Sequence, residues 1–215
     1  MKSSGVICTL VSSSLFLLLL AGCATLTDWW ENADLTGSAL SSEEIAADQS
    51  QPTRETQEYE DTYLSYEIPA NWQKHENSSD ELRLTLFTPQ DAATATPSNV
   101  SVQILSLQNR SKDFDYADPE VQKAYYEFLT SPDSGLPTQM QDKEYWTEQI
   151  GDTWVYSLRF TRETEDGTMV QQTGYFPMGL DYSLAVWATD YQDGYTPPVE
   201  EIAKHICETL QILEP

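Results

Sequence analysis

Four acidic residues gather just before the first helix that the sequence predicts, and carboxylates in such an arrangement can bind calcium. They are Asp113, Asp115, Asp118 and Glu120. Calcium prefers oxygen ligands on a flexible loop. The EF-hand pattern is not met, because its glycine and its last glutamate would fall on Asp118 and Ala124. The alternative is that these acids cap the helix and interact favourably with its dipole. Both interpretations stay open.

Nucleophilic catalysis would require a serine or cysteine with a base in reach, and His75 and His205 are the two histidines of the chain. His75 is close in sequence to Ser78 and Ser79, which does not establish that they are close in space. His205 falls beside the apolar stripe of the last predicted helix. Cys207 lies on the same helix and is expected to be a packed thiol, because an acidic chain offers little to activate it. A small envelope hydrolase is therefore the alternative, and we expect a protein that is not an enzyme.

The N-terminus has the pattern of an export signal. Met1 and Lys2 give a short positive start, and an apolar run follows from Gly5 to Ala21. The run is shorter than the ~20 apolar residues that span a membrane comfortably. We expect a signal peptide that is removed from the mature protein.

The run ends in Leu20, Ala21, Gly22 and Cys23, which resembles the bacterial lipoprotein signal at all four positions. The resemblance implies cleavage between Gly22 and Cys23, diacylglycerol on the Cys23 sulfur, and often a further acyl chain, such as palmitate, on the new amine. Two or three acyl chains hold a protein on a membrane far more firmly than one chain does. An ordinary secretory signal, or an uncleaved anchor, with a cysteine there by chance is the alternative. We expect a protein anchored by lipid at the extracytoplasmic face of a membrane.

The composition limits which partners the protein can bind and how its fold can be stabilised. The chain has 215 residues, with 35 Asp and Glu against 11 Lys and Arg, and a formal net charge of −24. Such a charge repels nucleic acid and anionic headgroups. Cys8 leaves with the signal peptide and Cys23 takes the lipid, so Cys207 has no partner within the chain and no disulfide is expected. An apolar core must stabilise the domain, and 6 Trp, 12 Tyr and 6 Phe can supply it.

The chain divides into three segments. Residues 1–22 are the signal peptide. Residues 23–58 are rich in Ser, Thr, Asp, Glu and Gln without sustained periodicity, which predicts an acidic flexible tether. Residues 59–215 form the folded domain. For the ~35 residues of the tether, the mean end-to-end distance is roughly 30 Å or more, enough to lift the domain off the membrane.

The residue pattern of the folded domain predicts an antiparallel sheet with helices packed on it, in the α+β class. Two early strands, 62–68 and 82–87, are expected to pair with each other. A helix should begin at Pro119, capped by Asp118, and end before Pro132. A last helix carries an apolar stripe that includes Leu210 and Leu213. The other expected strands span residues 100–107, 143–150, 153–161, 168–176 and 180–189.

The opening strand and turn, Tyr66-Glu67-Ile68-Pro69-Ala70-Asn71-Trp72, resemble the start of the PsbP-like superfamily. This group includes the photosystem protein PsbP and the Mog proteins. Together with the element order, the resemblance covers about residues 59–213. It implies an α/β/α sandwich around a central antiparallel sheet. It carries no activity, because relatives on one fold bind unrelated partners.

These observations predict a membrane-anchored, non-catalytic binding or assembly module of the cell envelope. Its expected partners are the membrane, through the lipid on Cys23, and a protein of the envelope. Nucleic acid is not an expected partner, and no cofactor is expected apart from the possible calcium ion. A calcium- or metal-responsive domain and a small envelope hydrolase are the alternatives.

Overall fold

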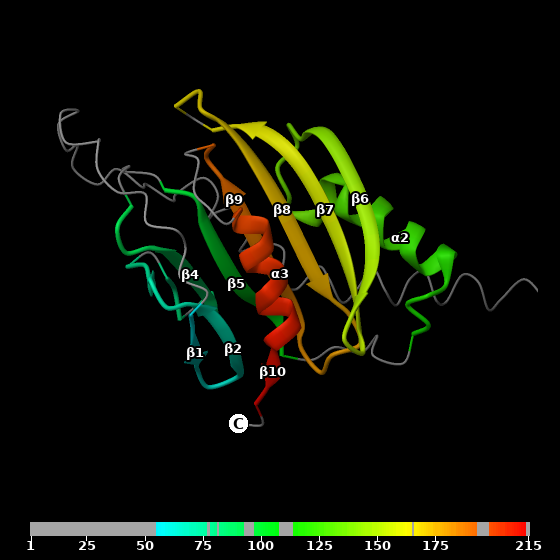
Figure 1. The fold of residues 1–215 in the computed structure, drawn as a ribbon. Helices are drawn as coiled ribbons and strands as arrows, with labels where there is room; N and C mark the ends of the chain where they lie inside the picture. Colours follow the sequence, from blue (N-terminus) through cyan, green and yellow to red (C-terminus); the bar gives the residue numbers. More distant parts are fainter. Residues whose placement is uncertain are drawn as a thin grey trace, which may run out of the picture.

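The computed structural model describes residues 55–76, 78–80, 82–92, 97–107, 114–164, 166–192 and 198–213. A seven-stranded antiparallel sheet dominates it, in the order β3-β4-β5-β9-β8-β7-β6 (Figure 1). Its strands in chain order are β3 (Trp72–Lys74), β4 (Leu84–Pro89), β5 (Asn99–Ser106), β6 (Gln141–Ile150), β7 (Thr153–Glu163), β8 (Met169–Pro177) and β9 (Ser183–Asp190).

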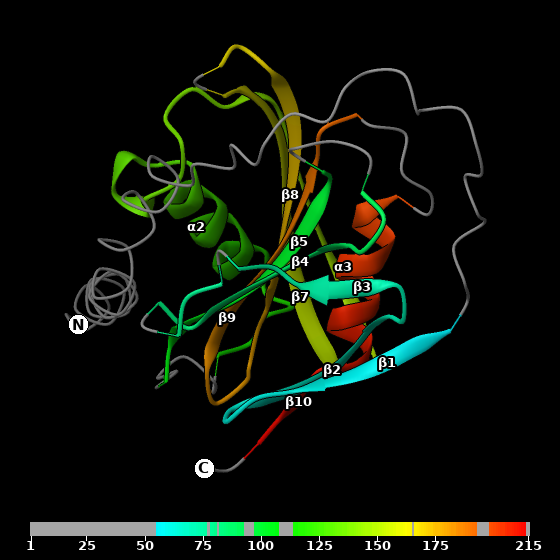
Figure 2. The same ribbon diagram turned by 90° about the vertical axis from the view of Figure 1, so that its left-hand side faces the viewer.

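A second antiparallel sheet has the order β1-β2-β10. Its strands are β1 (Thr56–Glu60), β2 (Leu64–Pro69) and β10 (Gln211–Ile212). The helices are α2 (Pro119–Leu129), α3 (Val199–Thr209) and the short 3-10 helix η1 (Pro132–Ser134). Figure 2 shows α2 and α3 on opposite faces of the large sheet, with the small sheet on the side of α3. No helix among the described residues is long and apolar enough to cross a membrane.

The alternation of side chains along β7 produces two cores, one on each face of the sheet. Tyr156, Leu158 and Phe160 belong to the core under α2, whereas Val155 belongs to the core under α3. The second core also includes the apolar stripe of α3, among whose members Ala203 and Ile206 have no exposed surface. Both faces of the central strands are therefore buried, and each helix covers one of the two cores.

Most elements lie where the sequence predicts them. The central antiparallel sheet is confirmed, as are α2 with its Asp118 cap and the four-strand run from β6 to β9. The expected pairing of strands 62–68 and 82–87 is wrong, because β2 pairs with β1 and β10, while β4 pairs with β3 and β5. The two expected strands lie in different sheets, and the short strand β3, which begins at the last residue of the expected turn, forms the edge beside β4.

Two boundaries differ from expectation for local reasons. Strand β1 begins at Thr56, inside the segment expected to be tether, because pairing with β2 organises residues that have little apolar character. Helix α3 ends at Thr209, so Leu210 does not continue its stripe; the chain turns extended there and pairs with β2 through Gln211 and Ile212.

The layers also differ from the implied α/β/α sandwich. One face of the large sheet carries α2, while the other carries α3 together with a three-stranded sheet. The described part of the chain is thus mostly β, and it shows a central sheet with one long helix on each face rather than two helical layers.

Candidate functional site

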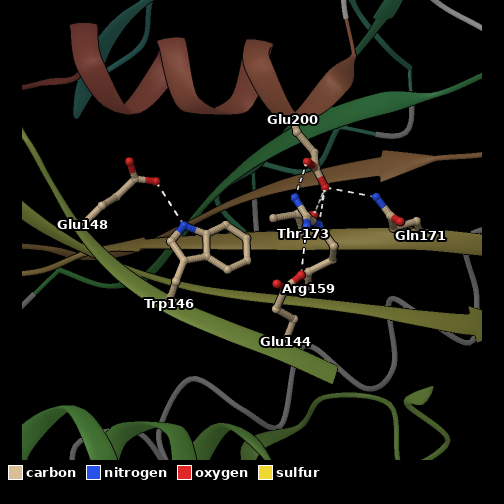
Figure 3. A network of polar contacts seen from close by, with 7 residues as sticks. All are labelled: Glu144, Trp146, Glu148, Arg159, Gln171, Thr173 and Glu200. Carbon is tan, nitrogen blue, oxygen red and sulfur yellow. Dashed lines mark hydrogen bonds and ion pairs between the residues drawn. The ribbon is translucent and has the colours of Figure 1, made fainter. Parts of the chain in front are cut away.

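The densest polar network of the domain lies where the start of α3 meets β6, β7 and β8 (Figure 3). Arg159 donates two hydrogen bonds to Glu200, from Nε to Oε1 at 2.8 Å and from an Nη to Oε2 at 2.6 Å. Its other Nη donates to Glu144 Oε2 at 2.9 Å. Gln171 and Thr173 also donate to Glu200 Oε1. This fork-to-fork geometry is the strongest form of arginine–carboxylate pairing.

A second part of the network surrounds the indole of Trp146 on the same face. The guanidinium carbon of Arg159 lies 5.1 Å from the centre of the Trp146 ring, within the range of a cation–π contact. The indole Nε1 donates to Glu148 Oε1 at 3.1 Å, and Lys204 of α3 donates to the other oxygen of Glu148. Tyr175 packs edge-on against the same indole. One ion pair, Glu148–Lys204, thus joins β6 directly to α3, and Arg159 of β7 bridges Glu144 of β6 and Glu200 of α3.

The electrostatics of this network favour its charged form. Burial by itself raises the pKa of Glu200, but hydrogen bonds from Arg159 and Thr173 outweigh it, so the pKa lies below the usual value. The bond to Glu200 raises the pKa of Arg159, and the bond to Glu148 raises that of Lys204. The network therefore consists of ion pairs that hold α3, β6 and β7 together.

On the opposite face of β6, one tyrosine packs against a tyrosine of α2. Tyr145 is 47% exposed, and its ring centre lies 5.1 Å from that of Tyr126 on α2. The Tyr126 hydroxyl donates to the Trp146 carbonyl and shares a hydrogen bond with Thr147. Burial raises the pKa of Tyr126 above its usual value. The outer strand thus presents an aromatic side chain to solvent while α2 supports it from behind.

We define the β6 surface as the outermost strand from Glu144 to Ile150 with the side chains it displays. Glu144, Trp146 and Glu148 lie on the α3 face, whereas Tyr145 lies on the α2 face. This surface combines a strand edge with no partner among the described residues, an exposed aromatic ring and carboxylates, which are features that an added strand can use.

The acidic residues expected to bind calcium lie at the start of α2. Asp118 is the N-cap, and its Oδ1 accepts from the Glu120 backbone N at 2.9 Å. Asp115 Oδ1 accepts from the Ala117 backbone N at 3.0 Å. Within the described ranges, no three metal-ligating side chains are grouped closely enough to hold an ion. Asp113 lies outside these ranges, so the calcium site stays a prediction.

Of the residues considered for hydrolysis, His75 and Ser78 lie in one turn, where the Ser78 N–H donates to the His75 carbonyl at 3.1 Å, whereas His205 and Cys207 lie on α3. Ser78 bonds both the N–H and the carbonyl of Leu86 through its hydroxyl, beside the β4 end of the sheet. His205 lies on α3 and contacts the carboxylates of Glu67 and Glu208. Cys207 is buried, as expected, and burial raises the pKa of its thiol. The serine hydroxyl and His205 thus have structural partners in separate parts of the domain.

The lipidation residue Cys23 and its neighbour Gly22 lie outside the described residues, so lipid attachment stays a prediction. The Arg159 network is not among the sites expected from the sequence. The sequence does contain a pattern that could predict this network. The two-residue turn Gly151-Asp152 sets the register of the β6–β7 hairpin and places Glu144 opposite Arg159. The same register puts Trp146 on the same face as both charges.

Comparison with known proteins gives fold-level likenesses. No protein-family model and no curated protein matches the sequence. Among solved structures, cyanobacterial PsbP (CyanoP) from Synechocystis sp. PCC 6803 is 13% identical, with a TM-score of 0.48 over 82% of this chain and 100% of that one. LpqN, described as involved in cell envelope biogenesis of Mycobacterium tuberculosis, is 14% identical, with a TM-score of 0.44 over 74% of this chain and 91% of that one.

A protein from Bacteroides thetaiotaomicron VPI-5482 is 14% identical, with a TM-score of 0.47 over 71% of this chain. This chain spans 46% of that protein's length. The neighbours thus include a PsbP protein, the group that the opening strand resembles. Likenesses of this extent leave membership of the family a prediction.

Proposed function

We propose that this chain is an extracytoplasmic lipoprotein, anchored through lipid on Cys23, whose domain is a non-catalytic binding or assembly module of the cell envelope. The observation that carries the anchor is the sequence Leu20-Ala21-Gly22-Cys23 at the end of an apolar run. Assignment of the domain to the PsbP-like superfamily is part of the same proposal.

The binding role is supported by how the polar side chains are used. Arg159 and Glu200 neutralise each other, and Lys204 neutralises Glu148. These pairs hold α3 and the outermost strand in fixed positions. What remains for a partner is the β6 surface itself, with its strand edge and the exposed ring of Tyr145.

The direction of the chain fits suspension from a membrane. The tether would enter the domain through β1, which is antiparallel to β2 in the small sheet. In the order β3-β4-β5-β9-β8-β7-β6, the β6 surface lies at the end of the large sheet far from β3. A tether of roughly 30 Å would leave this surface free to meet a partner in the envelope.

Lipid attachment is tested by growing a bacterial host with a radiolabelled or alkyne-tagged palmitate and isolating the full chain. We expect label on the wild-type protein, and mass spectrometry should place acyl chains on an N-terminal Cys23. Cys23→Ala should abolish the label and leave the precursor uncut.

Cys207→Ala is the matched control, because it removes the other cysteine of the mature chain, and it should keep the label. Label on the Cys23→Ala protein, or a mature N-terminus at any other residue, would refute the anchor.

A further inference from the structure

Strand β6 is the long open edge of the described structure. The other end strands are β3, with 3 residues, and β1 and β10 of the small sheet, with 5 and 2 residues, whereas β6 has 10. Proteins usually protect a sheet edge by keeping it short, bending it or placing proline in it. β6 contains no proline. Its charged side chains are one form of protection, and its backbone departs from regular pairing at the start, where Asp142 has a φ of 49° and the register shifts before Glu144.

The hairpin turn determines which backbone groups of β6 remain unpaired. Ile150 and Thr153 flank a two-residue turn, so they form a hydrogen-bonded pair. Pairs then alternate along the ladder, and the backbone groups of Tyr145, Thr147 and Gln149 point away from β7. Residues 144–150 therefore offer a regular edge to one more strand.

The side chains of β6 indicate the chemistry of the strand that would fit. On the α3 face, Glu144 keeps 63% of its side chain exposed even though it binds Arg159. On the α2 face, the exposed ring of Tyr145 would lie beside the neighbouring side chain of an added strand. A basic residue opposite Glu144 and an apolar or aromatic residue opposite Tyr145 would complement both faces.

Charge decides between a foreign segment and a second copy of this chain. The formal net charge of −24 makes two copies repel each other, and β6 itself contributes Asp142, Glu144 and Glu148 against Lys143. A basic extended segment is attracted by the same field. Main-chain hydrogen bonds would supply affinity and the alternating side chains would supply specificity.

We propose that the edge of β6 binds an extended, basic segment of a partner protein, which adds to the sheet as a further strand along residues 144–150. This inference deepens the proposed function and rests on it, because it names the surface and the partner chemistry of the binding module. The lipid assay and the binding assay can fail separately, because the first measures acylation of Cys23 and the second measures peptide binding at β6.

The test uses the mature full-length chain and a blocked seven-residue peptide in which lysine and valine alternate. In an antiparallel pairing with lysine opposite Glu144, all lysines lie on the α3 face and all valines on the α2 face. Calorimetry measures affinity, and amide NMR shifts locate the contact. We expect saturable binding, the largest shifts in β6, and weaker binding at higher salt.

Gln149→Pro removes one outward N–H on an edge strand, where proline spares the ladder to β7. It should weaken binding by about tenfold or more, roughly the loss of one or two main-chain hydrogen bonds. Gln149→Ala keeps the N–H and should bind within about twofold of wild type. Equal thermal unfolding of the two variants shows that the sheet is intact.

A peptide with glutamate in place of every lysine should not bind, because its charge has the sign of the surface. The proposal is overturned if the lysine peptide does not bind at millimolar concentration, or if Gln149→Pro binds it as wild type does. It is also overturned if sedimentation shows a dimer of the chain that Gln149→Pro converts to monomer. In that case the occupant of the edge would be a second copy.

Discussion

The indole of Trp187 lies directly against the backbone of Gly174 in the neighbouring strand of the large sheet. A Cβ atom added at Gly174 would lie 2.6 Å from two ring carbons. The ring is held between Phe160 and Phe176, with centroid separations of 6.2 and 5.5 Å. We expect Gly174→Ala to destabilise the domain by about 1–3 kcal/mol, the usual cost of overpacking, as measured by urea unfolding.

Met169→Ala is the control on the same strand, because Met169 is 41% exposed. It should change stability by only about 0.5 kcal/mol or less. If Gly174→Ala were as stable as this control, the Trp187 ring would be able to move aside for the added methyl group. The close contact of the ring with Gly174 would then not contribute to stability.

The Arg159–Glu200 pair should make stability depend on pH. The pKa of Glu200 is lowered in the folded state because bonds from Arg159 and Thr173 outweigh its burial. Its stabilisation is therefore present above the ordinary glutamate pKa and is lost as pH falls through the lower folded value. Glu200→Gln should lose less stability than wild type between about pH 6 and pH 3, as followed by urea unfolding at each pH.

Glu201→Gln is the matched control, since Glu201 lies one residue further along the first turn of α3 and is exposed. Its pH dependence should remain close to that of wild type. At neutral pH, Glu200→Gln should be less stable than wild type by roughly 1–2 kcal/mol, a value reduced for the partial exposure of the pair. An unchanged slope in Glu200→Gln would mean that solvent screens the pair fully.

The periodic elements could be predicted from the sequence because their side chains alternate strongly. The strand expected at residues 153–161 is β7, and its alternating residues Tyr156, Leu158 and Phe160 belong to the core under α2. On the opposite face of β7, Arg159 binds Glu200 at the start of α3. Local pattern and tertiary packing agree in this half of the domain.

The small sheet could not be predicted in the same way. β1 consists of Thr, Gln, Glu, Tyr and Glu, and Tyr59 is its one partly buried residue. Such a segment pairs because β2 offers a free edge and an aromatic cluster, which are tertiary features. The pairing of β10 with β2 likewise depends on where α3 delivers the chain. Local propensity does not predict strands whose pairing depends on long-range contacts.

Tyr59 should be the residue that attaches β1 to the domain. Its ring centre lies 5.3 Å from that of Tyr66 and 5.0 Å from that of Phe87. Tyr59→Ser removes these contacts, and we expect roughly 1–3 kcal/mol of destabilisation, less than for a fully buried aromatic ring. Amide hydrogen exchange should show loss of protection in β1, while the centre of β9 stays protected.

Glu60→Ser serves as control, because Glu60 is exposed on the same strand. It should leave the protection of β1 unchanged. If β1 remained protected in Tyr59→Ser, main-chain pairing with β2 would suffice to hold it, and the end of the tether would be fixed by backbone hydrogen bonds alone.

Asp118 allows helix capping and calcium binding to be separated. Asp118→Ala removes the acceptor for the Glu120 N–H and should cost about 0.5–2 kcal/mol. Asp118→Asn keeps an oxygen in the same place, so it should retain most of the stability while removing the charge. The thermal midpoints of the three proteins, measured without calcium, test the cap. A rise of the wild-type midpoint in millimolar calcium that Asp118→Asn lacks would instead establish the acidic residues as a calcium site, because the cap survives in that variant and only the charged ligand is lost.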